Sequence, residues 1–237
     1  MTKVHRFIGN WQLAHGNVRI DDADLAHQVR NVLKLGTGET VVLGDGTGNE
    51  AQCTVLSVER GAVVVNCTAI GRNANEPQAK LVLYCAVLKH EYFEEAVAMA
   101  TQVGVREIVP VVTSRTVKLN LRTDRVERII RESAELAGRG VIPALTDVTD
   151  IDGALTHAHR NDANLFLDPE GKPLTALGKG NRSVGIFIGP EGGWDERERG
   201  MAQDYGLRIV SLGPLVMRAP LAAAVGSFLT LHALEQH

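Results

Sequence analysis

The chain has 237 residues, of which 44% are apolar and 22% are charged, and its net charge is −3. This length can bury the core of one large domain or of two modest ones, and the composition is that of an ordinary globular protein. No apolar run reaches the length of a membrane-spanning helix, so we expect no membrane partner. Aromatic residues, at 4%, are too scarce for RNA recognition by many stacked rings.

The three cysteines, Cys53, Cys67 and Cys85, lie in apolar runs typical of strands. They lack the spacing of metal ligands, so no metal site is expected. We interpret all three as reduced core thiols of a cytoplasmic protein, with a thiol nucleophile as the alternative. The first six residues lack the apolar stretch of a signal peptide, which favours the same cytoplasmic location.

Charge is distributed unevenly along the chain. Residues 113–139 carry seven basic and four acidic side chains, whereas residues 140–237 carry eight basic and twelve acidic ones. An RNA-facing surface is one interpretation of the basic segment. A solvated helix with internal ion pairs, such as Glu127 with Arg131, is the simpler one on charge alone.

Up to about residue 70 the pattern predicts short strands, tight turns and one helix. The helix covers residues 22–34, where Leu25 and Val29 share an apolar face. Residues 40–43 lead into a hairpin at 44–48, because an Asp-Gly pair tolerates the positive φ angles of a tight turn. Further β-rich runs lie at residues 51–58 and 62–69. The pattern predicts a small β-barrel with one helix, followed by a polar linker at residues 71–77.

From residue 80 the pattern changes to alternating strands and helices. Strand-like runs lie at residues 81–88, 107–112, 165–167, 184–188 and 207–212, and helical patterns lie at residues 91–103, 123–137, 195–205 and 220–234. This alternation predicts an α/β domain with a mostly parallel sheet that is covered on both faces. Ligands of such sheets bind beyond the carboxyl ends of the strands.

Three predicted strands of this half end in loops rich in Pro and Gly, at residues 168–171, 189–193 and 213–218. The middle loop lacks the Lys and Ser/Thr of a phosphate-binding loop and does not form the dinucleotide pattern Gly-x-Gly-x-x-Gly. An adenosine moiety held by backbone groups fits it better. A plain strand-to-helix turn, capped by Asp195 with Glu198, explains the motif equally well.

Short motifs spread along the chain carry a family resemblance. The N-terminal matches are His5, Arg6, Phe7, His27, Val32, Leu33, Lys34, Gly36, Asp45 and Gly46. The later matches are Lys89, Gly104, Ile108, Pro110, Thr113, Ser114, Arg115, Glu132, Ser133, Ala134, Arg139 and Pro143, then Ile188 to Gly193 with Glu198, and finally Leu212, Gly213 and Arg218. In this order they resemble the ribosomal RNA small subunit methyltransferase E family of the SPOUT superfamily, nearly end to end.

The resemblance implies two domains. Residues 1–72 would form a PUA-like RNA-binding β-barrel. Residues 78–237 would form a SPOUT methyltransferase domain, an α/β domain with a trefoil knot, a topology almost absent from other folds. The implied cofactor is S-adenosyl-L-methionine. The implied protein is a homodimer that methylates N3 of one uridine in 16S ribosomal RNA of the small subunit.

The resemblance and the strand-end loops together predict the site residues. Those expected to bind the cofactor are Leu167, Ile188, Gly189, Pro190, Glu191, Gly192, Gly193, Leu212, Gly213, Met217 and Arg218. Those expected to contact RNA are Arg6, His27, Arg30, Lys34 and Lys118. The candidate catalytic residues are Arg115, Arg139 and Arg218, because a guanidinium can pair with the carbonyl oxygens of a base that becomes anionic. For each arginine, a phosphate contact or a structural ion pair is the alternative.

Two features of the sequence bear on the chemistry. No residue stands out as a general base; Glu191 is the nearest candidate, and it is expected to hold the loop or the cofactor instead. After Arg218 the chain reads Ala219, Pro220, Leu221, so the Glu of the family pattern and the Thr that follows it are absent, although a proline is tolerated where a helix begins. The alternatives are therefore a degenerate protein that binds ribosomal RNA and a methyltransferase with another RNA target. A flavodoxin-like nucleotide enzyme is disfavoured by the missing phosphate motif.

Overall fold

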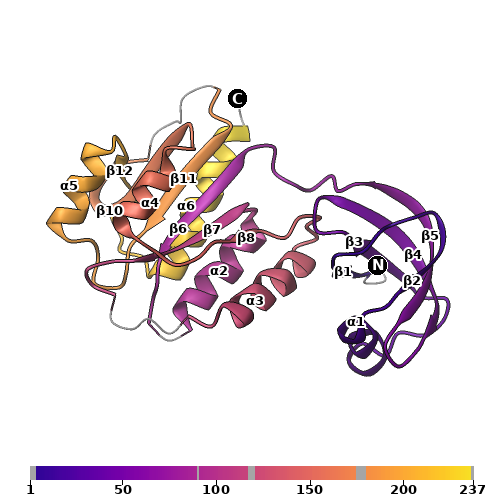
Figure 1. Ribbon diagram of the computed structural model, residues 1–237. Helices are drawn as coiled ribbons and strands as arrows, with labels where there is room; N and C mark the ends of the chain where they lie inside the picture. Colours follow the sequence, from indigo (N-terminus) through magenta and orange to yellow (C-terminus); the bar gives the residue numbers. More distant parts are fainter. Residues whose placement is uncertain (1–3, 90, 117–120, 175–179, 236–237) are drawn as a thin grey trace. The chain divides into compact units, whose positions relative to one another are not determined.

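The computed structural model describes residues 4–89, 91–116, 121–174 and 180–235. The chain divides into two compact units (Figure 1). Unit 1 runs up to Glu76 and also contains Ala134–Ile142, whereas unit 2 contains Pro77–Ser133 and the chain from Pro143 onward. The return of residues 134–142 to unit 1 depends on hydrogen bonds between distant segments, which a sequence pattern does not reveal. One such bond joins the Asn73 side chain to the Gly138 carbonyl at 3.0 Å.

Unit 1 is built on a five-stranded mixed sheet with the strand order β1-β3-β4-β5-β2. The strands are β1 (His5–Ile8), β2 (Gly16–Ile20), β3 (Thr40–Gly44), β4 (Asn49–Val58) and β5 (Val63–Arg72). Strand β1 is parallel to β3, and the other pairs are antiparallel. The predicted hairpin joins β3 to β4, with Gly46 and Gly48 at φ angles of 77° and 110°. Strand β5 continues through Arg72, so the predicted linker begins inside a strand.

The predicted helix of unit 1 is confirmed in two parts, α1 (Ala23–His27) and the π-helical η1 (Gln28–Val32). The Asp22 carboxylate caps α1 by accepting the N–H groups of Asp24 and Leu25. Leu25 and Val29 are buried in a core with residues of the sheet such as Val41. The apolar spacing that predicted this helix is therefore the spacing that packs it on the sheet.

The cysteine prediction is partly wrong. Cys53 on β4 lies opposite Cys67 on β5, and a disulfide joins them. The pairing register of two strands places these residues side by side, and their separation in sequence did not indicate it. Cys85 is free and buried, and burial, with the nearby Glu191 charge, raises the pKa of its thiol to about 12. A thiol that stays protonated is a poor nucleophile, so the thiol-nucleophile alternative loses its remaining candidate.

Unit 2 contains a seven-stranded sheet with the order β12-β10-β11-β6-β7-β8, in which β9 also pairs with β7. The strands are β6 (Lys80–Ala86), β7 (Glu107–Val112), β8 (Ala144–Leu145), β9 (Thr149–Asp150), β10 (Ala163–Pro173), β11 (Ser183–Ile188) and β12 (Arg208–Ser211). In the part of the chain that the structure describes, neighbouring strands of this sheet pair in parallel, which confirms the predicted fold class. The trefoil knot stays a prediction.

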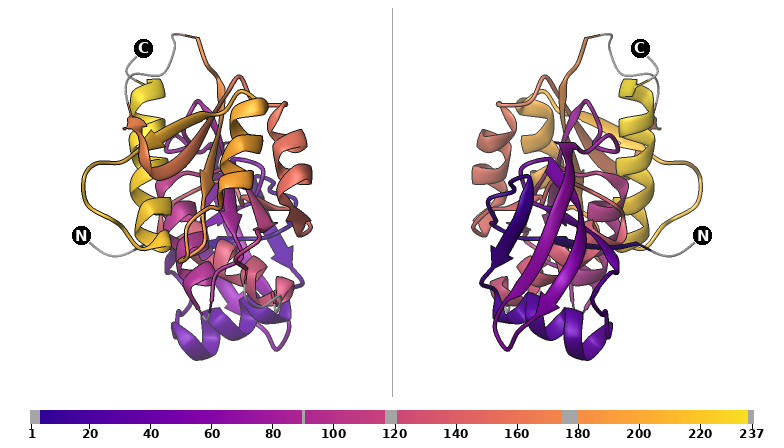
Figure 2. Two further views of the ribbon diagram at one scale, coloured as in Figure 1. Left: turned by 90° about the vertical axis from the view of Figure 1, so that its left-hand side faces the viewer. Right: turned by 90° about the vertical axis from the view of Figure 1, so that its right-hand side faces the viewer.

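Helices cover both faces of this sheet (Figure 2). The helices in this part of the chain are α2 (Tyr92–Val103), α3 (Thr123–Leu136), α4 (Ile151–Ala158), α5 (Glu196–Asp204) and α6 (Ala219–Glu235). Helices α2 and α6 pack together on one face, and α4 and α5 lie on the other. Helix α4, which the sequence pattern did not predict, is short and is capped by Asp150. In the described ranges, no helix has the length and apolar character needed to cross a bilayer.

One predicted loop lies inside a strand. Residues 168–171 belong to β10, which pairs with β12 both before and after them. Leu167 and Lys172 both face Val210, so the residues between them bulge out and the strand then resumes. The Gly171 backbone lies so close to β12 that an added Cβ would meet the Val210 main chain at 2.6 Å. This close approach explains the glycine better than a free loop does.

Candidate functional site

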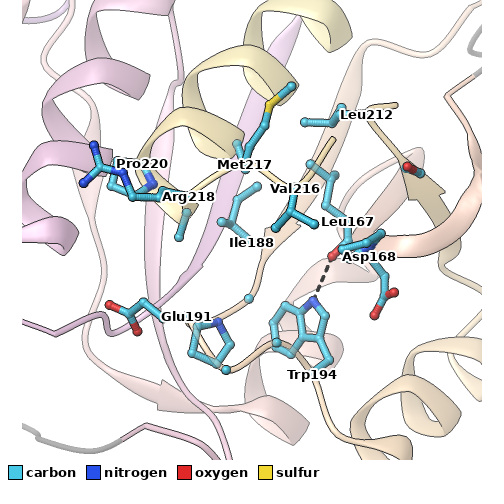
Figure 3. A pocket seen from close by; sticks show the side chains of 18 of the residues that line it. Leu167, Asp168, Ile188, Glu191, Trp194, Leu212, Val216, Met217, Arg218 and Pro220 are labelled. Carbon is cyan, nitrogen blue, oxygen red and sulfur yellow. Dashed lines mark hydrogen bonds between the residues drawn. The ribbon is translucent and has the colours of Figure 1, made fainter. Parts of the chain in front are cut away.

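A cavity of about 420 Å³ lies where β11 and β12 end and where β10 bulges after Leu167 (Figure 3). These strands share a region of the sheet, because β10 pairs with both of the others. The cavity is lined by all eleven residues that the sequence predicted for cofactor binding, from Leu167 to Arg218. The structure therefore brings the three predicted segments together around one space, as the rule for parallel sheets requires.

Other residues that were not assigned to the cofactor also line the cavity. They are Tyr92, Asp168, Pro169, Trp194, Val210, Ser211, Leu215, Val216, Ala219, Pro220 and Ala222. Asp168, Pro169, Leu215 and Val216 lie within the predicted loops, and most of the others are close to a predicted residue in the sequence. Tyr92, which begins α2, is far in sequence from all three segments.

Trp194 fixes the position of the middle loop. Its indole is 3% exposed, packs on the Phe166 ring at 4.3 Å between centroids, and donates from Nε1 to the Leu167 carbonyl at 2.9 Å (Figure 3). The same ring leaves no room for a side chain at Gly189, where a Cβ would lie 2.9 Å from Nε1 and Cε2. The loop after β11 is thus tied to the bulge of β10.

The remaining loop residues are held mainly by backbone groups. The Gly193 N–H donates to the Pro190 carbonyl at 2.8 Å, and Gly193 has a φ angle of 72°, which favours glycine. The Glu191 carboxylate accepts the Lys89 N–H at 3.0 Å. This bond ties the loop to the segment after β6 and agrees with the expectation that Glu191 holds the loop.

The capped strand-to-helix turn, which is the alternative interpretation of the segment at residues 189–193, is present as well. Asp195 caps α5, and Glu198 completes the capping box. The N–H of Glu198 and the side chain of Ser114 bond to the Asp195 carboxylate and lower its pKa. Glu198, which is buried, also accepts the Ser114 N–H at 2.8 Å. The motif is thus a capped turn that also lines the cavity, and the segment after β7 is attached to it.

This attachment places Arg115 beside the middle loop. Its guanidinium donates to the Gly192 carbonyl, and its side chain is exposed. A Cβ added at Gly192 would meet the Arg115 side chain at 3.2 Å. Arg115 is therefore next to the cavity, although it does not line it. Its catalytic role stays a prediction.

The third loop forms the exposed rim of the cavity. Leu215 and Val216 are 79% and 82% exposed, and Gly213 has a φ angle of 134° that favours glycine. Arg218 follows, with its guanidinium carbon 5.5 Å from the centroid of the Tyr92 ring. Helix α6 then begins at Ala219 with Pro220 in its first turn, as the sequence predicted.

The cavity has a charged end formed by Arg218 and Glu191, an apolar middle, and the carboxylate of Asp168 at its far side (Figure 3). Arg218 and Glu191 lie at one side, and Ile188, Val216 and Leu212 extend away from them. Asp168 lies at the far side and is held by a main-chain bond from Glu170 and by Arg199 at 3.6 Å. Among the residues that the structure describes, no cluster of His, Cys, Asp and Glu could hold a metal ion.

Two other predicted arginines, Arg139 and Arg6, form ion pairs within unit 1. Arg139 is buried, and its guanidinium donates to Glu76 from Nε at 3.3 Å and from Nη2 at 3.0 Å. Arg6 forms an ion pair with Glu50, and its side chain is 14% exposed. These contacts correspond to the ion-pair alternative for Arg139, and they do not support Arg6 as an RNA contact.

Three predicted RNA contacts of unit 1 are exposed. His27, Arg30 and Lys34 are spaced three and four residues apart along α1, η1 and the turn that follows. Lys34 has a φ angle of 55°, which is unusual for a residue with a side chain. Arg30 donates to the Val58 carbonyl. Lys118, the fifth predicted RNA contact, lies outside the described residues.

Comparisons with known proteins agree with this fold. Residues 74–228 match the RNA methyltransferase domain family, and residues 20–66 match the RNA methyltransferase PUA domain family. The chain is 32% identical over 155 residues to ribosomal RNA small subunit methyltransferase E of Mesomycoplasma hyopneumoniae, which covers 63% of this chain and 68% of the relative.

Two solved structures share the whole fold. Ribosomal RNA small subunit methyltransferase E from Neisseria gonorrhoeae, bound to S-adenosyl methionine, has a TM-score of 0.89 at 21% identity over 98% of each chain. A methyltransferase from Legionella pneumophila, solved with its cofactor SAM, has a TM-score of 0.89 at 25% identity, again over 98% of each chain.

The parallel sheet with its strand-end cavity and the match over residues 74–228 define this chain as an RNA methyltransferase that also carries a PUA domain. More narrowly, it belongs to the ribosomal RNA small subunit methyltransferase E family. This confirms the family that the ordered motifs predicted.

Proposed function

We propose that this protein methylates N3 of a specific uridine in 16S ribosomal RNA of the small subunit, with S-adenosyl-L-methionine as the methyl donor. The observation that carries the proposal is the cavity formed by the three strand-end segments, in a chain whose relatives are named ribosomal RNA small subunit methyltransferase E. A protein that acts on ribosomal RNA in this way would work in the cytoplasm.

The residues of the cavity fit S-adenosyl-L-methionine. Leu167, Ile188, Leu212 and Met217 offer an apolar wall for a flat adenine, and the segments at residues 189–193 and 213 offer main-chain groups for polar atoms. Gly189 has no space for a Cβ, so the backbone itself forms part of the wall there. The lining contains no lysine for a phosphate, which agrees with a cofactor that has none.

When bound, the cofactor would supply a methyl group that needs no further activation. The sulfonium sulfur would keep the electron pair of the breaking carbon–sulfur bond. Uracil N3 would form the new bond and lose its proton to water. The protein must therefore bind, orient and stabilise charge. Arg218 lines the cavity and can pair with the carbonyl oxygens that flank N3. Arg115, beside Gly192, is the second candidate for this role.

No side chain of the cavity is assigned as a general base. Glu191 lies at the charged end, but its carboxylate accepts the Lys89 N–H. We propose that Glu191 shapes the loop. Uridine N3–H is weakly acidic, so stabilisation of the anion by Arg218 favours loss of the proton to water. The base must leave its stack to reach the cavity.

We propose that unit 1 contributes the RNA-binding surface, with His27, Arg30 and Lys34 as contacts. All three side chains are exposed, and Arg30 and Lys34 are positively charged. The three residues are spaced to lie along one side of a helical segment. Arg139 and Arg6 would support the unit from inside through Glu76 and Glu50.

We propose that the protein is a homodimer that associates through α6. Phe228, Leu221 and Leu229 on this helix are 57%, 49% and 38% exposed. A helix that is apolar all round is normally buried, so an exposed apolar side suggests a partner surface. A second copy of the chain offers the same surface, which a two-fold interface requires.

The test is mass spectrometry of small-subunit ribosomal RNA from a strain that lacks the gene. We expect the loss of one N3-methyluridine, restored by the intact gene. An unchanged profile would refute the assignment of the reaction. If the purified protein then bound ribosomal RNA but not S-adenosyl-L-methionine in calorimetry, it would be a degenerate binding protein. If it bound the cofactor and methylated another RNA, the proposed RNA target would be wrong, but the proposed use of S-adenosyl-L-methionine as methyl donor would stand.

A further inference from the structure

The cavity contains two aromatic side chains with different settings. The Trp194 indole is buried and is committed to Phe166 and to the Leu167 carbonyl. Tyr92 is only partly buried, comes from the start of α2, and lies against Arg218. Trp194 therefore belongs to the framework of the loop, whereas Tyr92 lies where the cavity is charged.

Arg218 needs something to fix its direction. An arginine side chain has several rotatable bonds, and an exposed one loses much conformational entropy when it is held in one place. The residues after it, Ala219, Pro220 and Leu221, offer no charged or hydrogen-bonding side chain. The Tyr92 ring lies against the guanidinium of Arg218, with 5.5 Å between the ring centroid and the guanidinium carbon. This distance is within the range of about 6 Å for an attraction between a cation and a ring face.

We propose, on the basis of the function proposed above, that Tyr92 is a positioning residue that holds Arg218 at the mouth of the cavity, and that the Tyr92–Arg218 pair forms the subsite for the acceptor base.

The chemistry of the two ligands assigns this pair to the base rather than to the cofactor. S-adenosyl-L-methionine carries a positive sulfonium, which a guanidinium repels, and an amino-acid carboxylate, whose charge does not grow during methyl transfer. Uracil carries two carbonyl oxygens beside N3 and becomes negative when N3 loses its proton, so a guanidinium attracts it more strongly as the reaction proceeds. A flat base can also pack on an aromatic ring or on the guanidinium plane, as unpaired RNA bases commonly do. Arg218 and Glu191 share one side of the cavity, away from the apolar wall (Figure 3).

The experiment compares Tyr92→Leu with Tyr92→Phe, using small ribosomal subunits from the deletion strain as acceptor. The leucine variant keeps an apolar side chain but removes the ring face, so we expect kcat to fall about two- to fivefold. The phenylalanine variant keeps the ring face and should restore most of the turnover. Calorimetry should show that both variants bind S-adenosyl-L-methionine with nearly wild-type affinity. Tyr92→Met serves the same purpose if the leucine variant is unstable in thermal unfolding.

A double-mutant cycle separates positioning from a structural effect. In an Arg218→Gln background, measured under single-turnover conditions, Tyr92→Leu should have no further effect on the rate, because its role depends on the guanidinium. Additive losses would overturn the proposal, as would equal rates for the leucine and phenylalanine variants. A loss of cofactor affinity as large as the loss of turnover would also overturn it and make Tyr92 part of the cofactor wall. If the wild-type protein leaves the subunits unmethylated, the proposed function fails instead, independently of Tyr92.

Discussion

The substitution Gly189→Ala tests how the middle loop is held. The added Cβ would lie 2.9 Å from two atoms of the Trp194 ring, closer than side-chain carbons pack in proteins. The ring cannot move freely, because it is buried, packs on Phe166 and donates to the Leu167 carbonyl. Overpacking of this kind costs about 1–3 kcal/mol. Loss of the indole hydrogen bond would add about 1 kcal/mol.

The same displacement would move both the β10 bulge and the loop after β11. We therefore expect Gly189→Ala to lower the free energy of unfolding in urea by about 2–4 kcal/mol. We also expect cofactor affinity in calorimetry to fall by about tenfold or more, which corresponds to about 1.4 kcal/mol. Stability and affinity should change together, because one ring supports both.

Gly192→Ala is the matched control. It adds the same methyl group to the same loop, but its Cβ would meet only the flexible Arg115 side chain, at 3.2 Å. We expect it to change stability and cofactor affinity little. If Gly189→Ala and Gly192→Ala behave alike in both measurements, the reasoning from the Trp194 contact is refuted.

Three further predictions address other parts of the protein. Arg115→Ala should lower methylation of the small ribosomal subunit while calorimetry shows little change in cofactor affinity; normal methylation would remove Arg115 from the site. If the protein is the homodimer proposed above, Phe228→Asp should convert it to a monomer in light scattering, and a variant that stays dimeric would place the interface elsewhere. Burial by itself raises the pKa of Glu76, but Arg139 and the N–H groups of Val141 and its neighbour outweigh it and lower that pKa. The pair therefore stabilises unit 1 fully above the ordinary carboxyl pKa and loses this effect as the pH falls through the lowered value. Glu76→Gln should be less stable than wild type in urea at pH 7 and should approach it in acid; a constant difference would contradict this.

Local sequence patterns predicted correctly those elements whose structure depends on only a few neighbouring residues. The strand at residues 107–112 and the capped turn at Asp195 are confirmed because apolar spacing and capping act within a few residues. The segment at residues 168–171 was wrongly predicted as a loop, because its continuation as a strand depends on pairing with β12, more than thirty residues away.

The sequence by itself determined the alternation of strands and helices in unit 2 and the three segments that line the cavity. Two of these segments meet because chain direction in a parallel sheet brings the ends of β11 and β12 to one edge, and the third is the bulge within β10. Tertiary structure decided the contacts between distant residues: Cys53 with Cys67, Glu76 with Arg139, and Tyr92 with Arg218. Each of these pairs depends on strand register or helix packing. Such contacts carry no local periodicity, so only the folded chain reveals which side chains meet.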